Sequence, residues 1–187
     1  MVDKIITVKN KENSKFLYEY SICNTIEEVH QSAKTRYYPV TLAQTIEKIR
    51  MKEEKFAIVG VACFIKAIRL AQNKEPELSS KIPFLVGIIC GGVKSKFYTE
   101  YLASKAGASK GNIINPDYRF KNLNRNASDY TFKCSDSKKH LYSVDMKKLG
   151  DMWGTGLFKA NSCDFCDDVT TELADISVGD AWLPPYV

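Results

Sequence analysis

Two cysteines near the end of the chain have the spacing of a metal or redox site. Cys163 and Cys166 form a C-x-x-C pair within Asn161-Ser-Cys-Asp-Phe-Cys-Asp-Asp168. Two intervening residues allow both sulfurs to face one point, and the same spacing therefore recurs in zinc sites, iron–sulfur sites and dithiol redox sites. The pair alone does not choose among these chemistries, so the positions of the other cysteines have to decide.

Two further thiols follow predicted strands in the middle of the chain. The strands and the helices that follow them are expected at 56–60, 63–72, 84–89 and 95–106. This alternation predicts a βαβ unit with parallel strands and a right-handed crossover. Cys63 and Cys90 would then lie at the carboxyl ends of the strands, the edge where open α/β sheets bind ligands. If the strands are neighbours, about 4.8 Å apart, both thiols reach one site.

These four thiols form the candidate ligand set: Cys63, Cys90, Cys163 and Cys166. A structural zinc knuckle usually carries two C-x-x-C pairs, and a thioredoxin-type dithiol opens a helix just after a strand; neither pattern is met. Dispersed thiolates around one pocket favour a [4Fe–4S] cluster, although zinc stays open. Cys23 and Cys134, near the ends of predicted strands, are expected to have no ligand role.

The remaining elements complete an α/β fold. A hairpin is expected from strands at 4–8 and 15–22, and helices begin at the capping boxes of Thr25 and Thr41. After residue 112 the apolar pattern changes to period two, which predicts antiparallel strands at 118–121, 130–134 and 141–144. The predicted fold class is therefore a parallel βαβ core with an antiparallel strand extension and a Cys-rich C-terminal loop.

Composition excludes several classes of function. The 187 residues carry a formal charge of +5, spread as Lys/Glu mixtures rather than gathered in a basic tract, so a nucleic-acid partner is not expected. No apolar run approaches the roughly 20 residues of a membrane span, and the first residues lack the long apolar region of a signal peptide, so no export signal is expected. A cytoplasmic, reducing location is expected, where thiols serve as ligands more often than in disulfides. His30 and His140 are expected to be solvated, which leaves the catalytic residues unknown.

Four segments of the chain resemble motifs that occur together, in a fixed order, in one protein family. The family's Gly-Thr-Pro-Cys-Gln-Ile-x-x-Leu-Arg segment resembles Gly60-Val-Ala-Cys63-Phe-Ile-Lys-Ala-Ile-Arg69. Its Val-Gly-Leu-x-Cys-x-Gly-x-x-Ser segment resembles Val86-Gly-Ile-Ile-Cys-Gly-Gly-Val-Lys-Ser95. Its Cys-x-x-Cys and Ala-Asp-Ile-Ser-x-Gly-Asp-x-Trp blocks are similar to 163–166 and Ala174 to Trp182. Its Ser-Arg/Lys-Tyr-x-Pro-Val loop resembles Thr35-Arg-Tyr-Tyr-Pro-Val40. By these motifs the chain resembles the coenzyme F420 hydrogenase/dehydrogenase beta-subunit family.

The resemblance implies an iron–sulfur flavoprotein oxidoreductase that carries FAD and a [4Fe–4S] cluster. Electrons would pass between the cluster, the flavin and coenzyme F420 or a related acceptor, with a larger hydrogenase- or dehydrogenase-type subunit or a ferredoxin as protein partner. The cluster ligands carried over are the same four cysteines, 63, 90, 163 and 166. Flavin contacts are expected from Thr35, Arg36, Tyr37 and Lys121, with Arg119 beside the last, because Arg binds phosphate and aromatic rings stack on isoalloxazine.

Departures from the motifs keep other functions open. Val61-Ala62 stands where the family has Thr-Pro, which removes a hydroxyl from the turn before Cys63. Both ends are expected to be interior to a longer chain, with residues 1–54 as the end of the family's N-terminal domain and 55–187 as part of its cluster-binding domain. The alternatives are a zinc-binding structural or interaction module that uses the same cysteines, and an accessory electron-transfer fragment without flavin.

Overall fold

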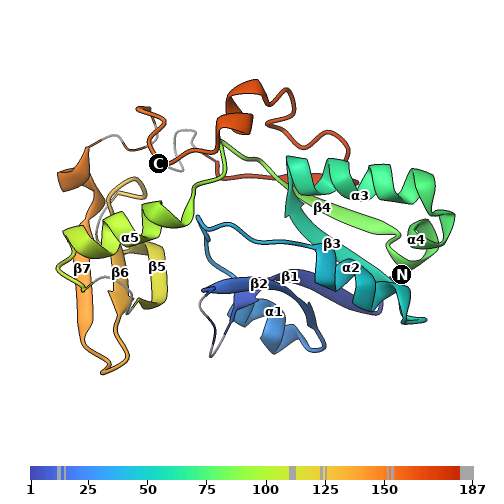
Figure 1. Cartoon of the computed structure of the whole chain (residues 1–187), viewed down its shortest axis with the longest axis horizontal. Helices are drawn as coiled ribbons and strands as arrows, with labels where there is room; N and C mark the ends of the chain where they lie inside the picture. Colours follow the sequence, from blue (N-terminus) through green and yellow to red (C-terminus); the bar gives the residue numbers. More distant parts are fainter. Residues whose placement is uncertain are drawn as a thin grey trace. The chain divides into compact units, whose positions relative to one another are not determined.

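The computed structural model describes residues 1–11, 14, 16–109, 113–122, 124, 126–150, 152 and 154–181 (Figure 1). Its helices are α1 (Ile26–Ser32), α2 (Ala43–Arg50), α3 (Ala62–Lys74), α4 (Pro76–Lys81) and α5 (Lys96–Lys105), with 3₁₀ turns η1 (Met146–Leu149) and η2 (Asn161–Phe165). Its strands are β1 (Lys4–Asn10), β2 (Tyr18–Cys23), β3 (Phe56–Val61), β4 (Phe84–Ile88), β5 (Ile114–Lys121), β6 (Tyr130–Ser135), β7 (Leu141–Asp145) and β8 (Ile176–Val178).

The chain divides into two compact units, and each unit is formed from several separate stretches of the sequence. Unit 1 comprises Met1–Ala33, Val40–Gly91 and Phe165–Asp180. The described residues of unit 2 lie within Lys34–Pro39 and Gly92–Asp164, with Ala181. No helix among the described residues is long and apolar enough to cross a membrane. The C-x-x-C pair falls on the division, with Cys163 in unit 2 and Cys166 in unit 1.

Unit 1 is built on a five-stranded mixed sheet in the order β2-β1-β3-β4-β8. The β1–β2 pair is antiparallel, which confirms the predicted hairpin. Strands β1, β3, β4 and β8 run parallel, and β3 pairs directly with β4. Helix α3 connects β3 to β4 and packs on both (Figure 1), so the predicted βαβ unit is confirmed with its two strands as neighbours.

The core of unit 1 lies between the sheet and its helices. Its fully buried side chains come from strands and helices alike: Ile6, Ile49, Phe56, Ile58, Ile65, Ile82 and Leu85. The sequence expectation for β3 is confirmed, since most of its residues are buried, as in a strand covered on both faces. β4 differs, because its terminal residues Phe84 and Ile88 are each 40% exposed.

Two helix faces differ from the sequence expectation. The apolar pattern predicts Leu70 inward with Ile65 and Ile68, but Leu70 is 59% exposed. At 3.6 residues per turn, Leu70 is rotated by about 140° from Ile65, so it lies on the opposite side of α3. On α5 the apolar pattern predicts Phe97 on the same buried face as Leu102. The same rotation of about 140° separates the two residues, and Phe97 is 56% exposed.

The two predicted capping boxes have different outcomes. Thr25 is the N-cap of α1, and its hydroxyl accepts a hydrogen bond from the Glu28 amide at 3.3 Å. α2 instead has Leu42 at its N-cap, without a side-chain cap. The Thr41 hydroxyl accepts from the amide of Ala43, two residues on, at 3.2 Å. This short-range turn competes with the longer capping bond, so the predicted start of α2 at Thr41 is wrong.

Unit 2 contains the predicted antiparallel extension, a three-stranded sheet in the order β5-β6-β7. β5 begins earlier than the alternating pattern indicates, because register shifts between Ile114 and Phe120 break the period of two. Side chains of Tyr118, Phe132 and Cys134 are at most 2% exposed and form the inner face. α5 packs against β6 and β7.

Candidate functional site

Cys63 and Cys90 follow the ends of two paired parallel strands. Val61, the last residue of β3, pairs with Ile88, the last residue of β4. Cys63 is the second residue of α3 and is exposed, while Cys90 is half-buried two residues beyond β4. The two strands are therefore neighbours, as the sequence argument required. Cys63 and Cys90 both follow the carboxyl ends of these strands, at the same edge of the sheet.

The segment that carries Cys166 returns to the same edge. The Cys90 amide donates to the carbonyl of Val169, three residues after Cys166, at 3.0 Å. The Ile89 amide donates to the carbonyl of Val178 at 2.9 Å, and β8 continues the sheet parallel to β4. Backbone pairing thus brings the residues just after the C-x-x-C alongside Cys90.

Cys163 lies in η2, within unit 2, and its sulfur accepts a hydrogen bond. The donor is the amide of Val93, at 3.3 Å, and the Ala160 amide donates to the Val93 carbonyl at 2.9 Å. This bond and the Ala160–Val93 bond fix the position of Cys163 next to the chain that follows Cys90. Gly92 makes the approach possible, because it has a φ of +135° and a side chain there would meet Lys159.

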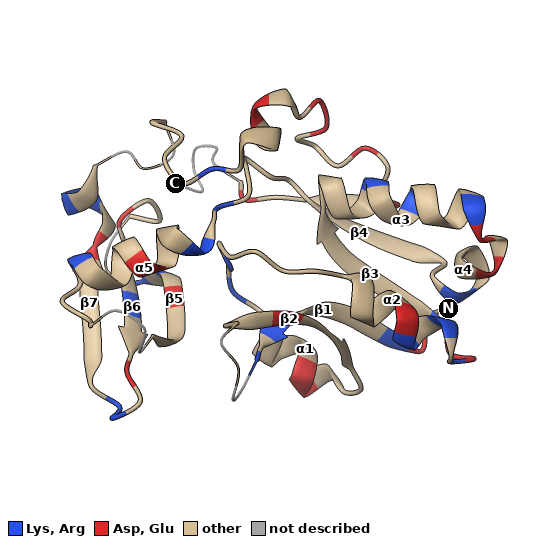
Figure 2. Ribbon diagram, in the orientation of Figure 1, with Lys and Arg blue, Asp and Glu red and all other residues tan. Residues whose placement is uncertain are grey.

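Carboxylates and lysines surround the C-x-x-C pair. From residue 160 onward the sequence carries six Asp or Glu residues and no Lys or Arg, whereas the whole chain is +5. Figure 2 marks acidic positions in red along the ribbon between η2 and β8. Lys159 forms an ion pair with Asp164, and this bond raises the pKa of Lys159. Lys66 pairs with Asp167 at 3.5 Å. The two lysines offset part of the negative charge beside the thiols.

Cys23 and Cys134 are buried, as expected of thiols without a ligand role. Both are 2% exposed and lie in strands. Burial, and secondarily the Asp136 carboxylate, raises the pKa of Cys134 to about 11. Burial likewise raises the pKa of Cys23. Both thiols stay protonated near neutral pH, when they are poor ligands and poor nucleophiles.

The four candidate ligands are thiols, which are the ligand type that soft metal centres prefer. None of the four thiols is in a disulfide, and none is fully buried. Across the described part of the chain, no three His, Cys, Asp or Glu side chains are gathered closely enough to hold a metal ion. Thiol chemistry, backbone pairing and the amide-to-sulfur bond fit a thiolate-bound cluster, while the side chains are not drawn together into one coordination shell.

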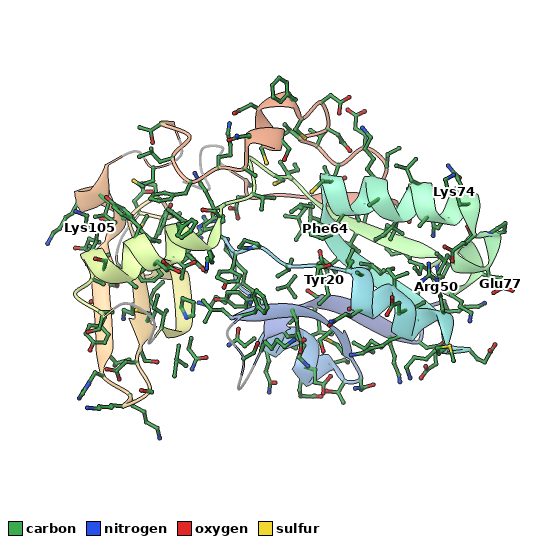
Figure 3. All side chains as sticks on the ribbon, viewed as in Figure 1. Tyr20, Arg50, Phe64, Lys74, Glu77 and Lys105 are labelled. Atoms are coloured by element: carbon green, nitrogen blue, oxygen red, sulfur yellow. The ribbon has the colours of Figure 1, made fainter. Side chains whose placement is uncertain are left out.

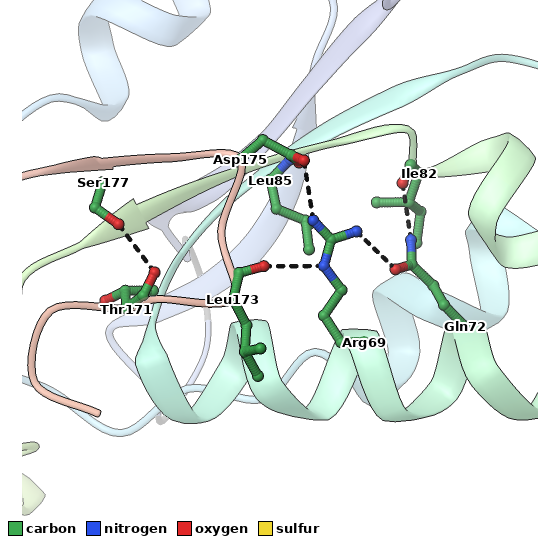
Figure 4. Close-up of polar contacts among 8 residues, drawn as sticks. All are labelled: Arg69, Gln72, Ile82, Leu85, Thr171, Leu173, Asp175 and Ser177. Carbon is green, nitrogen blue, oxygen red and sulfur yellow. Dashed lines mark hydrogen bonds and ion pairs between the residues drawn. The ribbon is translucent and has the colours of Figure 1, made fainter. Parts of the chain in front are cut away.

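A polar network anchors the C-terminal segment to α3 and β4 (Figure 4). The Arg69 guanidinium donates to the Leu173 carbonyl at 2.9 Å and contacts the Asp175 carboxylate at 3.1 Å. Asp175 also accepts from the Leu85 amide at 2.7 Å, and the Thr171 hydroxyl donates to the Ile88 carbonyl at 2.9 Å. Sequence reasoning missed this anchoring pair, although Arg69 and Asp175 both lie in the segments that carry the family resemblance.

The residues expected to contact flavin all lie in unit 2. Tyr37 is half-buried, with its ring 5.5 Å from that of Tyr118 and 6.1 Å from that of Tyr98. Arg36 donates to the Lys34 carbonyl at 2.5 Å, and Thr35 beside it is half-buried. Tyr37 therefore belongs to an aromatic cluster rather than to an exposed loop.

The second expected flavin-contact spot lies on β5. The Arg119 guanidinium lies over the ring of Tyr130, 5.4 Å from its centroid. Lys121 is exposed and pairs across the sheet with Tyr130. Tyr118, which contacts Tyr37, directly precedes Arg119 in this strand, so both spots adjoin the same aromatic cluster.

Lys94 is a buried cation that sequence reasoning did not single out. It is 1% exposed, and its Nζ donates to the carbonyls of Leu157 at 2.7 Å and Met152 at 3.1 Å. The Nζ also lies 5.5 Å from the centroid of the Tyr98 ring. Lys94 lies four residues after Cys90, within the family-like segment Val86 to Ser95, and this position could have marked it in the sequence as a structurally important residue. Lys94 holds the chain that leads into η2.

Fold and site together define a mixed α/β protein with accessible thiols beside one edge of its parallel strands. Residues 53–185 match the family described as the C terminus of the coenzyme F420 hydrogenase/dehydrogenase beta subunit, and residues 1–47 match the family described as its N-terminal part. The chain therefore belongs to the coenzyme F420 hydrogenase/dehydrogenase beta-subunit family. The predicted resemblance is confirmed. Trp182, part of one quoted motif, lies outside the described residues.

Individual relatives agree with this membership. The F subunit of the F(420)H(2) dehydrogenase of Methanosarcina mazei is 24% identical over 187 residues, covering 98% of this chain and 48% of the relative. The coenzyme F420-dependent sulfite reductase of Methanocaldococcus jannaschii is 26% identical over 172 residues, covering 84% and 25%. The chain thus spans about half or less of these curated relatives.

A solved structure has the same fold. A chain of the F420-reducing [NiFe] hydrogenase complex from Methanosarcina barkeri, studied by xenon derivatization, superposes with a TM-score of 0.65. The match covers 96% of this chain and 58% of the solved chain, at 21% identity.

Proposed function

We propose that this chain is the cluster-binding part of an iron–sulfur flavoprotein oxidoreductase. Its thiolates at 63, 90, 163 and 166 would hold a [4Fe–4S] cluster, which supplies one-electron transfer when bound. The observation that carries the proposal is the pairing of Cys90 with Val169 beside the paired ends of β3 and β4. This pairing brings together two regions, distant in sequence, that each carry candidate thiols.

Flavin contacts are proposed on unit 2. Thr35, Arg36 and Tyr37 adjoin the aromatic cluster of Tyr98 and Tyr118, and Arg119 and Lys121 lie on the neighbouring strand. Arg side chains suit the phosphates of FAD, and the Tyr rings suit an apolar edge of its isoalloxazine. In this assignment the chain binds and orients the flavin, and no side chain is assigned as a general acid or base.

The partners follow from the curated relatives. Both carry F420 in their names, and one is named as a subunit of a dehydrogenase. We accordingly assign coenzyme F420 or a related acceptor as the redox partner, and a larger hydrogenase- or dehydrogenase-type assembly as the setting. Residues 1–54 and 55–187 are proposed as parts of the family's two domains.

Metal analysis of protein purified without oxygen tests this function. We expect about four iron atoms per chain and broad visible absorption. Replacing a proposed ligand, as in Cys163→Ser, should abolish both, whereas the buried Cys134→Ala should keep them. A colourless protein with one zinc would replace the proposal with the zinc-binding alternative. Added FAD should lose fluorescence on binding; unchanged fluorescence would leave an electron-transfer fragment without flavin.

A further inference from the structure

The outer face of the unit 2 sheet carries exposed apolar side chains. Residues of β6 alternate between buried and outward positions, and Phe132 and Cys134 are the buried ones. The neighbouring strands pair Ile114, Phe120 and Leu141 with outward residues of β6, so these three side chains share the outer face. They are 40%, 39% and 85% exposed, respectively. The outer face of an antiparallel sheet is usually polar, and a group of exposed apolar side chains there indicates a contact surface.

Lysines lie beside this apolar group. Lys133 faces outward from β6, and its Nζ lies 3.2 Å from the centroid of the Phe120 ring. Lys138 and Lys139 are exposed in the turn that joins β6 to β7 and leads into Leu141. Figure 2 marks basic positions in blue at the tip of this hairpin. Within the described part of the chain, these three lysines form no ion pair. An apolar centre with a charged rim is the usual composition of a protein–protein interface.

Unit 2 is basic as a whole. The sequence of unit 2 carries 15 Lys or Arg and 7 Asp or Glu, a formal charge of +8, whereas unit 1 carries 12 and 15, a formal charge of −3. Carboxylates of the unit 2 sheet are already engaged: Asp117 pairs with Lys34 at 3.1 Å, and Asp145 accepts from the Thr131 hydroxyl at 2.8 Å. Asp136 accepts from two amides of its own turn. The lysines therefore dominate the charge of the outer face.

We propose that the outer face of the unit 2 sheet is a docking surface for an acidic electron-carrier protein. The surface consists of Ile114, Phe120, Lys133, Lys138, Lys139 and Leu141. This docking rests on the proposed function, in which the chain exchanges electrons with a partner. Charge complementarity steers such a partner toward the surface, and a small apolar centre suits the weak, transient encounters of redox proteins.

Two other occupants fit this surface less well. A nucleic acid would need open aromatic faces on which bases stack, but the Lys133 ammonium already lies over the Phe120 ring. A second copy of this chain would offer its acidic segment after residue 160. The carboxylates at 164, 167 and 175 in that segment already form ion pairs, so they have less charge to offer than a separate acidic protein.

Binding of an acidic plant-type [2Fe–2S] ferredoxin to the full-length chain tests the docking surface. The ferredoxin carries a fluorescent label, and its anisotropy is measured at about 20 mM and about 200 mM NaCl. We expect a Kd in the micromolar range at the lower salt concentration, weakened about tenfold or more at the higher one. A ferredoxin that fails to bind, or that binds equally at both salt concentrations, would overturn the inference.

Charge reversal separates this surface from the net charge of the chain. Lys138→Glu/Lys139→Glu should raise the Kd by about tenfold at low salt, because two attractive charges become repulsive. The matched control is Lys48→Glu/Lys74→Glu, which changes the net charge equally at exposed positions of α2 and α3 in unit 1 (Figure 3). The control should change the Kd by less than about threefold. Equal effects of the two double variants would contradict a specific surface.

A second variant tests the apolar centre. Leu141 is 85% exposed, so Leu141→Ala leaves the fold intact. It should raise the Kd by about three- to tenfold at both salt concentrations, because loss of apolar contact is not screened by salt. An unchanged Kd would remove the apolar group from the docking surface and overturn the inference as stated.

Iron content and flavin binding, measured on the same preparations, separate this docking from the proposed function. Lysine-dependent ferredoxin binding by a chain that holds neither iron nor flavin would reject the proposed function and keep the acidic docking. Iron-loaded protein whose binding is insensitive to Lys138→Glu/Lys139→Glu would do the reverse. Self-association in sedimentation that this variant abolishes, or equally tight binding of single-stranded oligo(dT), would replace the electron carrier with a second copy or a nucleic acid.

Discussion

At the scale of single residues, the thiols divide by environment rather than by sequence neighbourhood. Cys23 and Cys134 are enclosed in strands, and burial raises the pKa of each. Cys163 instead accepts an amide hydrogen bond, and Cys63 opens a helix. Buried, protonated thiols are poor ligands, so burial separates these two packing residues from the four candidate ligands, none of which is fully buried.

Lys94 should matter for stability through its two carbonyl partners. Lys94→Met leaves the carbonyls of Met152 and Leu157 without this donor, because methionine fills the volume but has no N–H. We expect the free energy of unfolding, measured in urea, to fall by about 2–4 kcal/mol. The exposed Lys96→Met should change it by no more than about 0.5 kcal/mol. Equal losses in both variants would mean that these carbonyl bonds do not stabilise unit 2.

At the scale of elements, the position of β8 at the edge of the sheet depends on how closely β4 and residues 171–178 approach each other. β8 is three residues long, and every one of them is exposed, so its own burial cannot hold it in the sheet. The network of Arg69, Asp175 and Thr171 supplies what burial does not. Gly87 in β4 has no side chain, which allows Thr171 and Ala174 to pack close to the strand.

Gly87→Ala tests that close approach. A methyl group there would lie 2.5 Å from Thr171 Cγ2 and 2.8 Å from Ala174 Cβ, so the 171–174 turn would have to shift. Overpacking of this kind should lower the free energy of unfolding by about 1–3 kcal/mol. Gly91→Ala is the matched control, since nothing lies within 4 Å of a side chain at that position. A neutral Gly87→Ala in chemical denaturation would show that the turn adapts freely.

At the scale of the whole molecule, the two units are interleaved in sequence. Lys34–Pro39 leaves unit 1 for unit 2, and the chain then returns at Val40. This short insertion supplies Tyr37, whose ring packs between α5 and β5 through Tyr98 and Tyr118. Unit 2 thus includes residues 34–39, which are separated in sequence from its main stretch, 92–164, by residues 40–91 of unit 1.

Tyr37→Ala should loosen unit 2 selectively. The lost ring contacts should cost about 2–4 kcal/mol. Hydrogen exchange followed by mass spectrometry should show faster exchange in β5 and β6, while amides of β3 and β4 keep their protection. Tyr37→Phe, which keeps the ring, is the control. Equal acceleration in β3 and β5 would mean that the two units open as one cooperative body.

The sequence by itself determined most of the strands and the family. Period-two and apolar runs predicted β3, β4 and the β5–β7 sheet, because side-chain alternation is a local property of strands. Four motifs in a fixed order were sufficient for the family. The C-x-x-C pair and the two thiols that follow strands were selected from spacing alone.

Only the tertiary structure decided which distant groups meet. Nothing in the pattern near Tyr20 indicates that its hydroxyl lies beside Gly60, and nothing near Arg69 indicates Asp175, 106 residues later. The pairing of β4 with β8, and of Cys90 with Val169, is equally non-local. Such contacts depend on the packing of the whole sheet, in which strands far apart in sequence become neighbours, and no local periodicity encodes them.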